Sequence, residues 1–338
     1  MNLHTFDKVL VDSTGAFLQG ELEVIDQTLH LPDVATTWSE DILPRTDINL
    51  ADSWASWTNS SYGRVGGLSS TGKSWGGNRR NGTPSVSLDI QKQQQELYAW
   101  ELEVDWDIFE LEAAAKLGRP IDFQKVTALG ALWNQDVDNQ AYLGDGDLGG
   151  TANSVTGLFN SDSKLVANNL LIAGTPAANG YTPIGSWLTA TPAQILADVR
   201  AMEINYYNST GTAKVGSKLL ISPTIFSTLL EPLIIGGVAF QSILDYISKN
   251  SFCIARTGKA LDIQPRKYLE TSNNSIGAGR AVLYDPAYET LRFPLTPLAH
   301  TPIEYRGTLQ LTTYYSKIGQ LEIVMPNRIL YLTNVYTV

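Results

Sequence analysis

Two runs of alternating residues, separated by a glycine-rich segment, constrain the fold of this chain more than any other feature. Within residues 85–106, apolar side chains recur at every second position from Val86 to Ile90 and again from Tyr98 to Trp106, and residues 48–58 show a similar spacing. Alternation of this kind is typical of β-strands, and the intervening residues 59–84 are rich in Gly, Ser and Asn. The pattern predicts a long protruding hairpin, which exposes its edges unless another chain covers them.

The N-terminal segment, residues 1–46, consists of short apolar pieces separated by Gly and Pro. Such a segment predicts an extended arm that lies across another surface and has no core of its own. Residues 1–17 lack the basic and apolar pattern of a signal peptide, and the longest apolar run, residues 229–240, is too short to cross a bilayer. The single Cys253 cannot form an internal disulfide, so we expect a protein of a reducing compartment.

Two consecutive helices are predicted after the hairpin. Asp107 is a suitable N-cap for a short helix that ends at Gly118, and Asp122 for a longer helix that ends at Leu143-Gly-Asp-Gly146. Apolar residues mark one face of the longer helix: Phe123, Val126, Leu129, Trp133 and Val137.

Helices and strands are mixed in the rest of the chain, which places it in the α+β class. Thr191-Pro192 and Ser222-Pro223 each open a helix, residues 218–221 predict a buried strand, and residues 243–247 are the last helical pattern. From Arg280 the sequence is largely β, with strands predicted at residues 281–284, 308–315, 320–325 and 328–335.

Charge limits the classes of partner. The 338 residues carry a net charge of −10, which disfavours reading of nucleic-acid sequence. Charged residues make up 17% of the chain, below the usual value of about 25%, so we expect other copies or partners to cover much of the surface. The three histidines are scattered along the chain, and no catalytic or metal-binding spacing includes them.

One motif points to a different function. Gly67 to Ser74 matches G-x-x-x-x-G-K-[ST], the loop that cradles nucleotide phosphates. That loop requires a buried strand before it and a helix after it, and neither flank has such a pattern. The acidic cluster Asp136, Asp138, Asp145 and Asp147 lacks the spacing of a calcium loop and is interpreted as a solvated helix end. We therefore predict neither a cofactor nor a metal.

Residues in and beside the glycine-rich segment are candidates for contacts between subunits. The cations can pair with an acidic neighbour, and tryptophan is enriched in protein interfaces. Stacking on sugars is the alternative role of the tryptophans, and a carbohydrate-binding module remains open on this ground. The predicted contact residues are Trp54, Trp57, Lys73, Trp75, Arg79 and Arg80.

The order of these parts resembles the major capsid proteins of tailed bacteriophages with the Hong Kong 97-type fold. The most specific points are Leu143-Gly-Asp-Gly146 and Thr156-Gly-Leu-Phe-Asn160. The resemblance implies an N-terminal arm, a long extended β-hairpin loop, a peripheral domain with a long spine helix, and an α/β axial domain. It assigns the arm to residues 1–46 and the hairpin loop to residues 47–106, with its tip at 59–84. The peripheral domain would be residues 107–149, with the spine helix at 122–143. Residues 150–290 would form mostly the axial domain, and residues 291–338 a return β segment of the peripheral domain.

The resemblance implies a structural protein without catalysis that self-assembles into the icosahedral shell around a phage genome. Its partners would be copies of itself in hexamers and pentamers, with a separate scaffolding protein, a portal and decoration proteins as further candidates. It would enclose double-stranded DNA without sequence-specific binding, contact no membrane, assemble in the bacterial host cytoplasm and reside in the virion. An encapsulin-type compartment is the alternative, and a nucleotide-binding protein using Gly67 to Ser74 is a further one.

Two departures from the resemblance change what we expect. Many relatives begin with a long helical scaffolding segment, and this chain does not, which implies a separate scaffold or none. Some relatives form covalent cross-links between a loop lysine and a neighbour's asparagine. Lys73 lies in a loop of that kind, but residues 295–307 contain no Asn, so we expect no cross-link.

Overall fold

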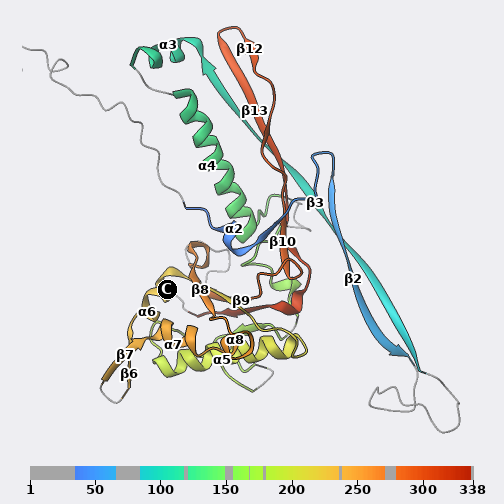
Figure 1. The fold of residues 1–338 in the computed structure, drawn as a ribbon, viewed down its shortest axis with the longest axis vertical. Coiled ribbons are helices and arrows are strands. Elements are labelled where there is room, and N and C mark those ends of the chain that lie inside the picture. Colours follow the sequence, from blue (N-terminus) through green and yellow to red (C-terminus); the bar gives the residue numbers. More distant parts are fainter. Residues whose placement is uncertain are drawn as a thin grey trace, which may run out of the picture. The chain divides into compact units, whose positions relative to one another are not determined.

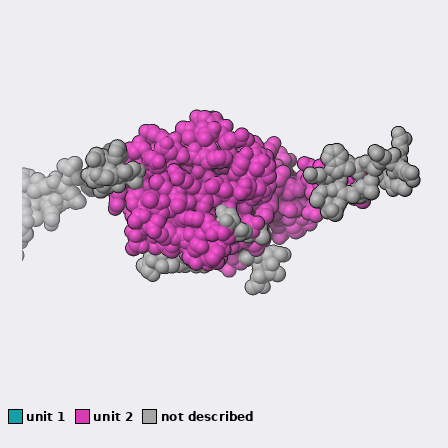
Figure 2. Space-filling view, turned by 90° about the horizontal axis from the view of Figure 1, so that it is seen from below, with its two compact units in different colours: residues 1–34, 102–132, 300–313 teal, residues 35–101, 133–299, 314–338 magenta. Residues whose placement is uncertain are grey.

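A computed structural model describes residues 35–65, 84–117, 121–148, 155–166, 168–177, 180–235, 238–270 and 279–335. These residues form two compact units. Unit 1 contains the described parts of residues 102–132 and 300–313, and unit 2 contains those of residues 35–101, 133–299 and 314–338. Unit 2 is drawn in magenta in Figure 2. The predicted division into arm, loop and two domains stays a prediction.

The predicted hairpin is present. Strand β2 (Trp54–Val65) pairs antiparallel with β3 (Ser85–Asp107), from Trp54 opposite Glu96 to Val65 opposite Ser85 (Figure 1). Strand β2 therefore begins six residues later than predicted and continues into the segment that was expected to be loop. The polar residues of this segment show no strand pattern in the sequence, because their β conformation depends on pairing with the facing strand.

A five-stranded sheet in unit 2 carries the main core. Its strand order is β4-β15-β9-β5-β8, in which β15 lies antiparallel to β9 and parallel to β4. These strands are β4 (Leu170–Ile172), β5 (Lys218–Ile221), β8 (Asp262–Pro265), β9 (Arg280–Tyr284) and β15 (Ile329–Thr333). Strand β5 is buried at all four positions, as the sequence predicts.

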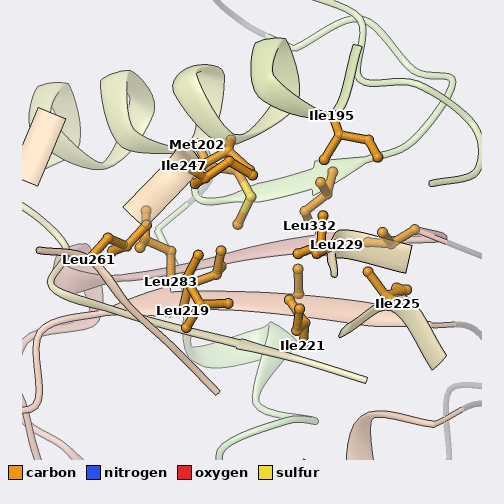
Figure 3. Close-up of a cluster of buried hydrophobic side chains, with 14 of the residues drawn as sticks. Ile195, Met202, Leu219, Ile221, Ile225, Leu229, Ile247, Leu261, Leu283 and Leu332 are labelled. Carbon is orange, nitrogen blue, oxygen red and sulfur yellow. The ribbon is translucent and has the colours of Figure 1, made fainter. Parts of the chain in front are cut away.

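Helix α5 (Pro192–Ser209) covers one face of this sheet. Thr191 and Gln194 form a capping box at its start, with Pro192 in the first turn. Ile195 and Met202 point from α5 toward Leu283 and Leu332 of the sheet (Figure 3). Burial of this apolar layer supplies the main driving force for folding of unit 2.

Shorter elements complete the described chain. The remaining helices of unit 2 are α2 (Trp38–Asp41), α6 (Pro223–Leu229), α7 (Ile243–Lys249) and α8 (Phe252–Thr257), with short 3-10 turns η2 (Asp162–Lys164), η3 (Lys267–Leu269) and η4 (Pro326–Arg328). Strands β6 (Pro232–Ile235) and β7 (Val238–Ser242) pair with each other, and β1 (Leu43–Arg45), β10 (Leu291–Pro294) and β14 (Glu322–Ile323) form a small sheet. The remaining strands are β11 (Ala299–His300), β12 (Glu304–Arg306) and β13 (Leu309–Gly319), which belong to the sheet of the hairpin.

The two predicted helices after the hairpin are α3 (Ile108–Leu117) and α4 (Ile121–Tyr142). Helix α4 begins at Ile121, so the prediction of Asp122 as its N-cap is wrong: Asp122 lies inside the first turn. The predicted apolar stripe is buried at Leu129 and Val137 and half-buried at Trp133. Phe123 is 70% exposed in the chain by itself.

The end of α4 joins the two motifs that carried the family resemblance. The last carbonyl groups of a helix lack partners inside the helix. Here the Ala141 and Tyr142 carbonyls accept bonds of 2.9 Å from the backbone N–H groups of Leu158 and Phe159. The Asn160 side chain closes the arrangement, since its Nδ2 donates to the Leu143 carbonyl.

This close approach explains two glycines. Gly144 has φ +71°, and an added Cβ at Gly144 or Gly157 would overlap backbone atoms of the facing segment. Nothing lies within 4 Å of the same position at Gly146. Glycine is therefore required at 144 and 157 for contact between the helix end and residues 155–160.

We predict that Gly157→Ala destabilises unit 2 by about 2–3 kcal/mol, because the added methyl group forces the α4 end away from residues 155–160. Urea unfolding followed by tryptophan fluorescence measures the change. Gly146→Ala is the matched control and should change stability by less than about 1 kcal/mol. Equal effects of the two substitutions would show that the close packing is not maintained in solution.

Candidate assembly surface

The base of the hairpin is fixed to the rest of unit 2. Ala55 and Leu97 are buried in a small cluster with Ile48. Asn59 Nδ2 donates to the Val324 carbonyl at 3.0 Å, and Arg45 Nη1 donates to the Ser56 carbonyl at 3.2 Å. These contacts hold the first residues of β2, and the remainder of the strand extends beyond them (Figure 1).

Beyond its base the hairpin exposes an apolar face. Tyr62 lies opposite Leu88 in the ladder, so their side chains share a face, and Val86 and Ile90 lie two residues to either side of Leu88 on that face. These four side chains are between 61% and 86% exposed. An isolated two-stranded hairpin is marginally stable in water, and so large an apolar group marks an interaction surface. We name Tyr62, Val86, Leu88 and Ile90 the hairpin face.

The hairpin also concentrates positive charge. From residue 53 to residue 88 the sequence contains no Asp or Glu, but it contains Arg64, Lys73, Arg79 and Arg80. The whole chain has a net charge of −10, so the charge of this segment is opposite to that of the rest of the chain. The predicted contact residues Lys73, Trp75, Arg79 and Arg80 lie outside the described residues.

The structure places the two other predicted contact residues on opposite sides of β2. Trp54 is exposed, whereas Trp57 is buried by its own chain. Their positions differ by three, and an odd difference in a strand puts side chains on opposite faces. The role of both residues in contacts between subunits stays a prediction. The alternation of Val86, Leu88 and Ile90 is visible in the sequence, but it does not tell an exposed apolar face from a buried one.

The phosphate-loop motif, residues 67–74, also lies outside the described residues, but its flanks are described. Strand β2 before it is exposed along its last six residues, and the chain resumes as the antiparallel strand β3. A nucleotide-cradling loop follows a buried strand and opens a helix. The described flanks therefore do not supply the context that this motif requires.

The acidic cluster divides into two environments. Asp136, Asp145 and Asp147 are exposed, as expected for a solvated helix end. The same prediction is wrong for Asp138, which is buried. Its Oδ1 accepts bonds of 2.9 Å from the backbone N–H groups of Thr37 and Trp38. Within the described ranges, no group of His, Cys, Asp or Glu side chains could hold a metal ion, and no helix is long and apolar enough to span a membrane.

A buried ion cluster holds helix α2 against unit 2. The Asp41 carboxylate, which is inaccessible to solvent, binds Arg266 through Nε at 2.6 Å and Lys218 through Nζ at 2.8 Å. Tyr142 of α4 donates its hydroxyl to the same carboxylate, and Tyr284 donates to the Asp41 carbonyl at 3.0 Å. Residues 35–46, which were expected to belong to an arm without a core, are thus anchored in the core of unit 2.

The surroundings of Asp41 decide its protonation. Burial by itself raises the pKa of a carboxyl group, but the hydrogen bonds from Arg266, Lys218 and Tyr142 outweigh it and hold the pKa of Asp41 below its ordinary value. The carboxylate therefore stays ionised at neutral pH. Its contribution to stability is present above the pKa of the unfolded chain and is lost as the pH falls through the folded-state pKa.

The fold is that of proteins that build shells. The chain superposes on the capsid of Myoviridae phage XM1 with a TM-score of 0.73 at 16% identity, over 94% of this chain and 99% of that one. It is also similar to the capsid of a native GTA particle (TM-score 0.58, 11% identity, 97% and 98% covered). A third similar structure is the SrpI encapsulin of Synechococcus elongatus PCC 7942 (TM-score 0.54, 11% identity, 98% and 96% covered).

Residues 72–335 match the family model described as major capsid protein. That match covers most of the chain, so the chain belongs to the major capsid protein family. No curated protein matches the sequence. The resemblance to major capsid proteins inferred from the order of the sequence elements is thereby confirmed.

We predict that Asp41→Asn destabilises unit 2 by about 3–5 kcal/mol at pH 7, because Arg266 and Lys218 would remain buried without their counter-charge. Urea unfolding at several pH values measures this effect. The difference between the two proteins should shrink as the pH falls below the ordinary range for aspartate, where the wild-type carboxylate also becomes protonated. A difference that does not depend on pH would contradict the assigned role of the charge.

Proposed function

We propose that the chain assembles from hexamers and pentamers into a closed icosahedral shell around a double-stranded DNA genome, without catalysis and without sequence-specific contact to DNA. The hairpin face is the observation that carries this proposal, because it leaves four large apolar side chains exposed on one side of a strand pair. Burial of this face by neighbouring copies would couple the stability of the hairpin to assembly.

The parts of the chain have separate roles in this proposal. Residues 1–46 reach a neighbouring subunit through the part that precedes the Asp41 anchor, and residues 47–106 overlie the adjacent subunit. Helix α4 is the spine of a peripheral domain, and most of residues 150–290 form the axial domain around the five-fold and six-fold positions. Assembly takes place in the host cytoplasm, with scaffolding, portal and decoration proteins as further partners.

An encapsulin-type compartment is the second candidate function. The similarity to the SrpI encapsulin supports it, since that structure covers as much of this chain as the phage capsids do. The higher TM-score of the phage XM1 capsid favours the phage shell. Nuclease-protected DNA in particles purified from an infected host would support the phage shell, whereas particles with a protein cargo and no DNA would support the compartment.

We predict that Leu88→Asp combined with Ile90→Asp lowers the yield of closed particles at least ten-fold, because two charges would be buried in the contact between copies. Negative-stain electron microscopy with light scattering measures the yield of the recombinant chain, with co-expressed scaffold where one is required. The thermal unfolding of the unassembled protomer should shift by less than about 2 °C, since both side chains are exposed there.

Ser87→Asp combined with Gln91→Asp is the matched control, because it adds the same charge to the opposite face of the same strand. This variant should form particles at close to the wild-type yield. Equal loss in both variants would show that added charge on the hairpin, and not burial of the hairpin face, prevents assembly.

A further inference from the structure

The turn that follows helix α4 contains the only Asp-Gly pair of the chain, Asp145-Gly146. Both residues are exposed, and both belong to unit 2. In such a pair the backbone nitrogen of the glycine can close a five-membered ring on the carboxyl group of the aspartate. Glycine has no side chain to hinder that approach and adopts the required backbone angles at little cost. The pair is therefore a candidate for a spontaneous reaction of the main chain.

The fold holds the aspartate side chain in the position that this reaction needs. Asp145 Oδ1 accepts a bond of 2.9 Å from the backbone N–H of Asp147. A bond from the residue two positions further on closes an Asx turn, which folds the carboxyl group back over the peptide that joins Asp145 to Gly146. The carboxyl carbon is thereby kept beside the Gly146 nitrogen. Holding the two reacting groups together removes most of the entropic barrier to a reaction between them.

The Gly146 nitrogen is free to react. Among the described residues no hydrogen bond engages its N–H, and nothing lies within 4 Å of the position that a Cβ would take. Ring closure therefore breaks no hydrogen bond of the backbone and meets no neighbour. Asp162, which precedes Ser163, is the contrast, because Arg280 binds its two carboxylate oxygens at 2.5 and 2.9 Å and holds them away from the main chain.

We propose that Asp145-Gly146 is a site of self-modification, at which the chain converts aspartate to isoaspartate without an enzyme. The Gly146 nitrogen attacks Asp145 Cγ, its N–H bond and one Cγ–O bond break, and one water leaves as the succinimide ring forms. Water then adds to one of the two ring carbonyl groups. Opening at Cγ restores aspartate, and opening at the main-chain carbonyl leaves isoaspartate. The two steps release and consume one water, so no oxidant, reductant or co-reactant is needed.

The position of the site gives the modification a structural consequence. Isoaspartate lengthens the main chain by one carbon directly after Gly144, whose backbone lies so close to Val155 and Gly157 that an added Cβ would overlap them. A longer chain beside this contact displaces it, and close-packed contacts tolerate little displacement. Aged chains therefore lose packing between the α4 end and residues 155–160. This inference is independent of the proposed function, because it concerns a single copy.

Ageing of the purified full chain in warm neutral buffer over several weeks tests the site. Fragmentation mass spectrometry of its peptides locates isoaspartate, and enzymatic methylation of isoaspartate counts it. The product should form at Asp145 in at least ten-fold excess over Asp162, whose carboxylate is held by Arg280. The folded chain should convert at no less than a tenth of the rate of a synthetic peptide of residues 141–149, because no described contact opposes ring closure.

Two substitutions test the assigned atoms. Gly146→Ala should lower the rate at least five-fold, because the added methyl group hinders the attacking nitrogen. Gly185→Ala is the matched control and should leave the rate unchanged, since Gly185 is also exposed with nothing within 4 Å of its Cβ position. Asp145→Glu keeps the charge and should abolish the product, because ring closure would then need a six-membered ring. The melting temperatures of the fresh variants show that each one folds.

Three results would overturn the proposal. No excess of isoaspartate at Asp145 over Asp162 would show that the turn does not favour the reaction. Conversion slower than a tenth of the peptide rate would show that the fold protects Asp145, and an unchanged rate in Gly146→Ala would show that the nitrogen is not the limiting group.

Urea unfolding tests the consequence for unit 2. Aged wild-type chains should unfold at a lower urea concentration than fresh ones, whereas equally aged Asp145→Glu chains should not. Unfolding that does not change as isoaspartate accumulates would contradict the effect on the α4 end.

Discussion

The end of helix α4 is the contact on which the arrangement of unit 2 depends. A helix of 22 residues has unsatisfied carbonyl groups at its end, and residues 158–160 satisfy three of them. The same segment is bound from the other side, because Arg280 of β9 pairs with Asp162 and lies 4.6 Å from the centre of the Tyr331 ring in β15. Helix, loop and central sheet are therefore joined through hydrogen bonds that tolerate little displacement.

A second constraint is that the hairpin leaves large apolar side chains exposed. Its base is held by side chains such as Asn59 and Arg45, but the last six residues of β2 are exposed. Burial of side chains that are apolar and exposed in the protomer makes the free energy of association more favourable. A protein built in this way has a modest stability as a single copy and gains stability when copies meet.

Charge is distributed in keeping with this arrangement. The acidic excess lies outside residues 53–88, and the basic excess lies in the hairpin. Complementary charges of this kind favour contact between unlike parts of two copies over contact between like parts. Apolar burial then supplies affinity, while charge selects the pairing.

Much of the fold could be predicted because it is encoded locally. Thr191-Pro192 and Ser222-Pro223 open helices because their side chains and fixed backbone angles act on the first turn, and the burial of β5 follows from its apolar run. Helix α8 was missed, since a helix of six residues carries too little periodic signal. The family resemblance likewise rested on short glycine motifs, and the structure supplies their reason in the contact between Gly144 and residues 155–160.

The sequence by itself determined the hairpin, the acidic charge balance and the capped helices. The charge balance follows from composition, and the hairpin and the caps depend on residues close together in the chain. Tertiary structure alone decided which charges are buried. Asp41, Lys218 and Arg266 are separated by up to 225 residues, and no local pattern distinguishes Asp41 from an exposed aspartate. It also decided which face of the hairpin is exposed, since this depends on strands and helices that are distant in sequence and meet only in the folded chain.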